Sequence, residues 1–222
     1  MGKITILPET TTDPISLIGR RAGICQGRDI TDKDKNYKRG LECIKSNHGR
    51  AFEFVNVESI IEGYSARVIR EWYTHIGGSP TRLQSSTRYI KYNDFDYIMP
   101  KSVKTEEQQV LFENTIDTIQ QALCNLEDSG VAREDMAMLL PLGMTTKIVD
   151  KRNARNIIDM SRQRMCSRAY WEYRELFYEY LKQLSKYSEE WITLIEMTMM
   201  PKCEELGYCT ERFSCGRKPR KD

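Results

Sequence analysis

Apolar residues recur with two different periods in this sequence, and the change of period restricts the folds that the chain can adopt. In residues 52–61, FEFVNVESII, apolar and polar side chains alternate, which is typical of a strand with one buried face. In residues 112–126, apolar side chains recur at four- and three-residue spacing, which predicts an amphipathic helix. The sequence therefore predicts an α+β fold with a helix-rich C-terminal half.

Glycine and proline residues predict where the helix, loop and strand between these two regions begin and end. Residues 65–76 have a helical pattern that Gly77 and Gly78 would end, because glycine adopts the left-handed conformation common after a helix. We expect a loop over residues 80–86. The alternating residues 88–100 predict a strand that ends at a proline.

Length and charge limit the class of protein. A chain of 222 residues without repeats or a linker is expected to form one domain over 1–222, with a short basic tail from about residue 216. The 34 basic and 32 acidic residues leave a net charge of +2, which argues against a nucleic-acid binder. No apolar run is long enough to span a bilayer and no secretory signal is evident, so we expect a cytoplasmic protein that binds no membrane.

The seven cysteines have no tight pairing pattern, and we expect them to be reduced thiols that bind no metal. A zinc site is the minor alternative. Its ligands would be the three evenly spaced cysteines of the C-terminal segment and one earlier cysteine: Cys166, Cys203, Cys209 and Cys215.

Residues 73–89, YTHIGGSPTRLQSSTRY, combine glycine, proline, arginine and hydroxyl side chains in one short segment. Arg82, Arg88 and the hydroxyls of Ser85 and Ser86 are groups that bind phosphate. A surface turn with solvated arginines is the alternative, which composition alone favours. The segment is thus a candidate wall of an anion-binding pocket.

A second candidate region is the helical segment NARNIIDMSRQRMCSR. Its beginning would carry Asn153 and Arg155, close to the positive end of the helix dipole, which favours a bound anion. Arg164 would then face inward toward that anion. The alternative is an intrahelical ion pair of Arg155 with Asp159 and two exposed arginines, Arg164 and Arg168.

Taken in order, these segments resemble the flavin-dependent thymidylate synthases. The matching blocks are HGRAFEF at 48–54, Arg70-Glu71-Trp72, Thr74-His75-Ile76 in the place of the family's Arg-His-Arg, Ser79, Ser86-Thr87-Arg88-Tyr89, LPLGMTTK at 140–147, Asn153-Ala154-Arg155, Arg164 and Trp171-Glu172. Three departures mark the chain as a divergent member. Thr74 and Ile76 replace both signature arginines, two residues are inserted before Ser86, and Ala137 stands near the place of a further arginine.

The resemblance implies an α+β subunit of a homotetramer with FAD and substrate bound between subunits. The implied reaction is the reductive methylation of dUMP to dTMP, with methylenetetrahydrofolate as carbon donor and NADPH as reductant. A different modification of a pyrimidine nucleotide, such as hydroxymethylation, is one alternative. A non-catalytic nucleotide-binding or RNA-binding protein on the same fold is another.

The resemblance also assigns roles to individual residues. The residues expected to bind dUMP are Glu71, Gln84, Ser85, Ser86, Arg88 and Arg164. Among these, Arg164 and Ser86 are the catalytic candidates. Residues expected to hold the flavin are His48, Thr74, His75, Ile76, Ser79, Arg82, Asn153, Arg155, Asp159 and Arg168. Within this set, we expect Arg82 to supply charge that the missing arginines no longer give, and Gly77 and Gly78 to lie against the ligand.

Overall fold

The computed structural model describes residues 2–221, and its centre is an antiparallel sheet. The strands are β1 (Lys3–Ile6), β2 (Asn56–Ser65), β3 (Thr81–Gln84) and β4 (Thr145–Asn153). They are arranged in the order β1-β2-β4-β3, with every neighbouring pair antiparallel. The two long strands β2 and β4 therefore form the middle of the sheet, and β3 lies at one edge.

Helices account for most of the C-terminal half, as predicted. The helices are α1 (Pro14–Cys25), α2 (Lys33–Lys45), α3 (Ala66–Trp72), α4 (Glu106–Asp128), α5 (Arg133–Met136), α6 (Ala154–Arg164), α7 (Trp171–Ser185), α8 (Glu189–Thr198) and α9 (Lys202–Leu206), with the 3-10 turns η1 (Gly49–Phe54) and η2 (Ala137–Leu139). The α+β fold class is confirmed. No helix among residues 2–221 is long and apolar enough to cross a membrane.

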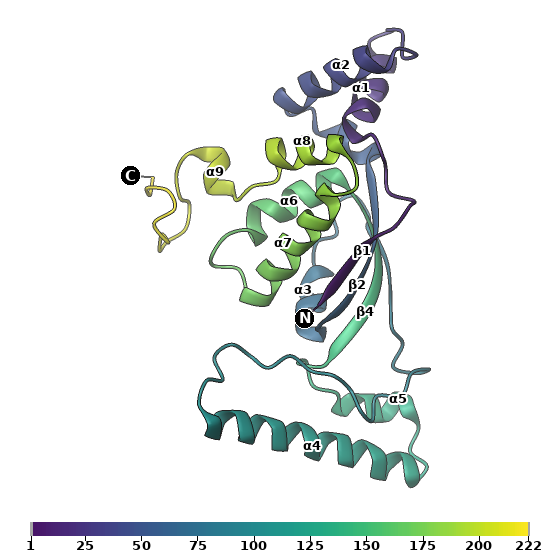
Figure 1. Ribbon diagram of the computed structural model, residues 1–222, viewed down its shortest axis with the longest axis vertical. Coiled ribbons are helices and arrows are strands. Elements are labelled where there is room, and N and C mark those ends of the chain that lie inside the picture. Colours follow the sequence, from purple (N-terminus) through teal and green to yellow (C-terminus); the bar gives the residue numbers. More distant parts are fainter. Residues whose placement is uncertain (1, 222) are drawn as a thin grey trace.

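The main core lies between the sheet and the helices that cover one of its faces, among them α6 and α7 (Figure 1). Alternation along β2 places Val57 and Ile61 in this core, where both are fully buried. The next residues along the strand, Glu58 and Glu62, point to the opposite face. There they form ion pairs with Lys151 and Lys147 of β4. The sheet is thus buried on one side and polar on the other.

Helix α4 packs outside this core. It begins with a capping box in which Thr105 and Gln108 exchange hydrogen bonds with each other's backbone. Its buried side chains join a smaller apolar cluster with residues of α5 and of the preceding loop. Figure 1 shows α4 and α5 beyond one end of the long strands, at a distance from α6 and α7. The helix predicted from residues 112–126 is confirmed.

Three local predictions were wrong. The helix predicted over 65–76 ends at Trp72, well before the glycines. The predicted loop 80–86 contains the edge strand β3, which pairs with β4. Residues 88–100 form no named strand, and only Tyr97 makes an isolated bridge, to Met144. The reason is tertiary contact, since this segment is held by side chains of α4 and α5, among them Arg133, which donates to the Tyr89 carbonyl.

Candidate functional site

Three of the residues predicted to form the site meet where α3 ends and α6 ends. Arg164, the last residue of α6, donates from Nε to His75 Nε2 at 2.8 Å. Its Nη1 lies 3.2 Å from Glu71 Oε2, and its guanidinium covers the ring of Tyr173 at 4.5 Å. The Arg164 side chain is only 21% exposed, so the arginine is held in a fixed orientation with a minor part of its surface open. Arg164 faces inward, as predicted.

His75 in this group is a neutral hydrogen-bond acceptor. Burial, together with the positive charges of Arg164 and Arg152, lowers the pKa of His75 to about 4. At neutral pH the ring is therefore uncharged, and its Nε2 lone pair accepts from Arg164. His75 orients the arginine and does not serve as a proton donor at that nitrogen.

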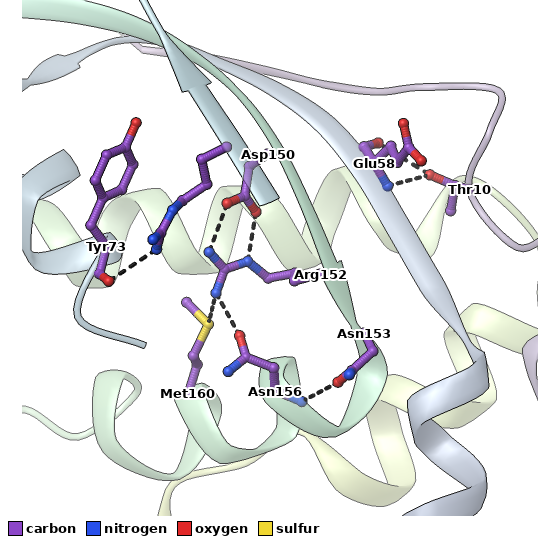
Figure 2. Close-up of polar contacts among 9 residues, drawn as sticks. Thr10, Glu58, Tyr73, Asp150, Arg152, Asn153, Asn156 and Met160 are labelled. Carbon is purple, nitrogen blue, oxygen red and sulfur yellow. Dashed lines mark hydrogen bonds and ion pairs between the residues drawn. The ribbon is translucent and has the colours of Figure 1, made fainter. Parts of the chain in front are cut away.

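Strand β4 carries a fully buried ion pair, Asp150 with Arg152, whose arginine is near enough to His75 to lower the pKa of that histidine (Figure 2 shows the pair). Arg152 binds Asp150 through two bonds, Nε to Oδ2 at 2.6 Å and Nη2 to Oδ1 at 2.8 Å, and both side chains are 0% exposed. Its Nη1 donates to Asn156 Oδ1 at 2.6 Å, and the guanidinium lies over the ring of Trp72 at 4.4 Å. This pair was not among the residues predicted from the sequence. The available signal was two charged residues on the face of β4 that also carries Thr146 and Ile148.

Asn153 joins the loop after α3 to the beginning of α6. Its Oδ1 accepts from the Asn156 backbone N–H at 2.9 Å, which caps the helix, and its Nδ2 lies 3.4 Å from the Gly78 carbonyl (Figure 2 shows the cap). Gly78 has a φ of 73°, and a Cβ there would lie 2.2 Å from Asn153 Nδ2. The expected neighbour of Gly78 was a ligand. Within this chain, the close neighbour is instead the Asn153 side chain, which explains why a side chain is excluded there.

Arg82 lies on strand β3, whereas we expected it in a loop. Its register partner is Asp150 of β4. The guanidinium donates from Nη1 to the Tyr73 carbonyl at 2.9 Å and covers the Tyr73 ring at 4.3 Å. It therefore holds the chain that follows α3. Gln84, two residues farther along β3 and on the same face, donates to Thr146 Oγ1 at 3.2 Å.

The hydroxyl-rich end of the predicted wall lies beside α5. Arg88 forms an ion pair with Glu134 at 2.7 Å and is 65% exposed. Ser86 Oγ accepts from the Arg88 backbone N–H, and the Ser85 backbone N–H donates to the Lys147 carbonyl. No contact within residues 2–221 joins Ser86 or Arg88 to Arg164. The structure of one chain therefore does not bring these predicted substrate residues together.

The other predicted flavin residues are dispersed. His48 is exposed and precedes η1, beside which Arg155 pairs with Glu53. Asp159 pairs with Arg162, and Arg168 lies 3.4 Å from Glu211. The remaining three, Thr74, Ile76 and Ser79, are exposed on the turn between α3 and β3.

A cavity of about 760 Å³ adjoins Arg164. One wall is the end of α6 and the loop after it, with Asp159, Arg164 and Arg168 from the predicted site. The other wall is the C-terminal segment, residues 201–218. The four cysteines of the zinc alternative also line this cavity, but residues 2–221 contain no group of three Cys, His, Asp or Glu placed to hold a metal ion. The structure gives no support to a zinc site.

Comparison with known families decides what kind of protein presents this arrangement. The family model described as "Thymidylate synthase complementing protein" matches residues 7–188. The chain belongs to the flavin-dependent thymidylate synthases. It is 31% identical to the flavin-dependent thymidylate synthase of Nitratidesulfovibrio vulgaris, over 79% of this chain and 74% of that protein. It is 26% identical to that of Clostridium tetani, over 98% and 94%. The family predicted from the sequence motifs is confirmed.

The fold agrees with the same family. The structure of thymidylate synthase X from Helicobacter pylori, determined with FAD and dUMP, superposes on this chain with a TM-score of 0.66. The superposition covers 88% of this chain and all of that one, at 13% identity. As a member of the flavin-dependent thymidylate synthases, the protein is an enzyme that depends on flavin and makes thymidylate.

Proposed function

We propose that this flavin-dependent thymidylate synthase methylates dUMP at C5, with FAD as cofactor, methylenetetrahydrofolate as carbon donor and NADPH as reductant. The observation that carries the proposal is the convergence of Glu71 and His75 on Arg164, which lines the cavity of about 760 Å³. All three residues stand at positions that the family motif reserves for its ligands. Arg164 is fixed by two partners before any ligand arrives, which lowers the entropic cost of binding an anion.

The residues present fit a phosphate-bearing cofactor and substrate. Six basic and two acidic side chains line the cavity next to Arg164, so its surface favours anions. Bound FAD, once reduced by NADPH, would supply the hydride that reduces the transferred one-carbon unit. The chain's own residues bind and orient dUMP and the flavin. Arg164 holds an anionic group of dUMP, and Glu71 and neutral His75 keep the guanidinium in position. Asn153 and Arg155 contribute to flavin binding at the beginning of α6.

The remaining substrate residues would come from another subunit. Ser86, the second catalytic candidate, and Arg88 lie on a turn beside α5, and within one chain they do not contact Arg164. In a homotetramer whose sites lie between subunits, this turn would face the Arg164 group of a neighbour. Exposed apolar side chains are available for such an interface, including Val110 and Leu111 of α4 and Leu83 of β3.

Light scattering tests the assembly. We expect about four times the monomer mass of 26.0 kDa at micromolar concentration. A monomer at that concentration would contradict both the tetramer and the shared site. We further propose that the chain forms one domain over 1–222 with a basic tail from about residue 216, and that it acts in the cytoplasm.

Two measurements test the activity. Purified protein incubated with FAD and then desalted is expected to retain a flavin absorption spectrum. With dUMP, methylenetetrahydrofolate and NADPH, mass spectrometry is expected to detect dTMP. A product heavier than dTMP by one oxygen would indicate hydroxymethylation. Failure to retain flavin would indicate a non-catalytic nucleotide-binding or RNA-binding protein on the same fold.

A further inference from the structure

The cavity beside Arg164 has an outer wall made by residues 201–218, here called the C-terminal wall. The family model ends at residue 188, so the wall lies beyond the part of the chain that defines the family. It consists of α9 and the irregular chain that follows (Figure 1). The role of this wall is therefore not contained in the family motifs.

Ion pairs and hydrogen bonds fasten the C-terminal wall to the body of the protein. Glu205 of α9 accepts two bonds from Arg162 of α6, at 2.8 and 2.9 Å. Farther along, Glu211 lies 3.4 Å from Arg168. Arg217 Nη1 donates to the Met165 carbonyl at 3.2 Å. Because both ends of the wall are attached to α6 or to the loop after it, the cavity has a defined second side.

The basic side chains of the cavity fall into two groups. Arg162, Arg164, Arg168 and Lys218 each pair with a carboxylate. Lys202 and Arg217, both on the C-terminal wall, have no carboxylate partner among residues 2–221. Arg217 donates from Nη1 to the Met165 carbonyl and also hydrogen-bonds with the side chains of Cys203 and Tyr178, and its five N–H donors leave others available. These two cations are therefore the ones available to an incoming anion, and guanidinium and ammonium groups are the usual ligands of phosphate.

An aromatic ring lies on the same wall. Phe213 lines the cavity and is 63% exposed, which is unusual for a phenylalanine. Exposed aromatic rings next to cationic side chains provide stacking surfaces for the bases of nucleotides. The cavity volume of about 760 Å³ lies in the range of small-molecule and cofactor pockets.

We propose that the C-terminal wall completes a nucleotide pocket, in which Lys202 and Arg217 bind phosphate and Phe213 stacks on a ring of the ligand. The identity of the ligand rests on the proposed function. FAD, dUMP and NADPH share the chemistry of a ring joined to phosphate, and the experiment distinguishes them. Part of the charge lost with the two signature arginines is thereby supplied from the far end of the chain.

Affinity measurements on matched variants test the proposal. Lys202→Ala and Arg217→Ala each remove one cation of the wall. Their controls, Lys221→Ala and Arg220→Ala, remove a cation of the same type from the residues that follow the wall and do not line the cavity. FAD is titrated by fluorescence, and dUMP and NADPH by calorimetry, at low salt. We expect each wall variant to lose at least tenfold in affinity for one of the three ligands, with a smaller loss at high salt. The controls are expected to bind like the original protein.

Cysteine alkylation provides a second readout on the unmodified sequence. Cys166 and Cys215 line the cavity, whereas Cys25 is exposed elsewhere and serves as an internal control. Hydrogen bonds from the Ser167 side chain and from the Arg217 backbone lower the pKa of the Cys215 thiol, which favours its reaction with iodoacetamide. The ligand that depends on Lys202 and Arg217 is expected to slow alkylation of Cys166 and Cys215, and to leave Cys25 unaffected.

The outcomes separate this inference from the proposed function. If Lys202→Ala and Arg217→Ala bind all three ligands normally while Arg164→Ala does not, the nucleotide pocket at the C-terminal wall is refuted and the proposed function stands. Ligand binding without protection of Cys166 and Cys215 would refute it as well. If the original protein binds none of the three ligands, both proposals fail.

Discussion

Breaking the buried ion pair beneath the site should destabilise the protein strongly. Asp150→Asn removes the carboxylate that accepts two bonds from Arg152, while the guanidinium stays in a position that is 0% exposed. Removal of one partner of a buried pair costs about 3–5 kcal/mol, because an uncompensated charge remains in the interior. The contacts of Arg152 with Asn156 and with the ring of Trp72 stay and offset a part of this. We therefore expect a loss of about 3 kcal/mol.

Urea unfolding followed by circular dichroism measures this loss. The matched control is Glu58→Gln, which breaks the 3.1 Å ion pair with Lys151 on the open face of the same sheet. That exposed pair should contribute at most about 1 kcal/mol. The double variant Asp150→Leu with Arg152→Met removes both charges, and we expect it to be more stable than Asp150→Asn alone. A loss below about 1 kcal/mol for Asp150→Asn, or a double variant less stable than the single one, would refute the reasoning.

Three further predictions concern the site. Arg164→Ala should weaken dUMP binding by about 10- to 100-fold, the equivalent of one charge-assisted hydrogen bond, and unchanged affinity in calorimetry would contradict its assigned role. Because the folded-state pKa of His75, about 4, lies below its ordinary 6.5, the contribution of His75 to the unfolding free energy is complete above pH 6.5 and is lost as the pH falls to about 4. His75→Gln should therefore lose less stability than the original protein between about pH 7 and pH 4.5, and equal losses in urea titrations would contradict this. Gly78→Ala should lower the free energy of unfolding by about 1–2 kcal/mol, since the φ of Gly78 is 73° and a Cβ there would displace the Asn153 cap. In the control Gly77→Ala, the added Cβ meets only an ordinary contact at 3.4 Å. Equal unfolding midpoints for the two variants would show that the cap is not disturbed.

The local sequence pattern was sufficient to predict an element wherever that element's structure depends on its own residues. The spacing of apolar residues over 112–126 predicts α4, because a helix needs one buried face and its backbone bonds are all internal. The beginning of α6 was likewise predicted near Asn153, and the structure shows that this residue caps the helix. The order of the motifs was enough to identify the family, even without the two signature arginines, because several separate blocks retain their spacing.

Contacts between distant segments were decided only by the tertiary structure. Strand β3 exists because β4, more than sixty residues later, supplies its backbone partners, and nothing in residues 81–84 shows this. The meeting of Arg164 with Glu71 and His75 and the burial of Arg152 depend in the same way on how helices pack on the sheet. A period along the chain reports which face of an element is buried, and it carries no information about which other element covers that face. For that reason the sequence supplied candidate residues for the site, and the fold alone decided which of them lie together.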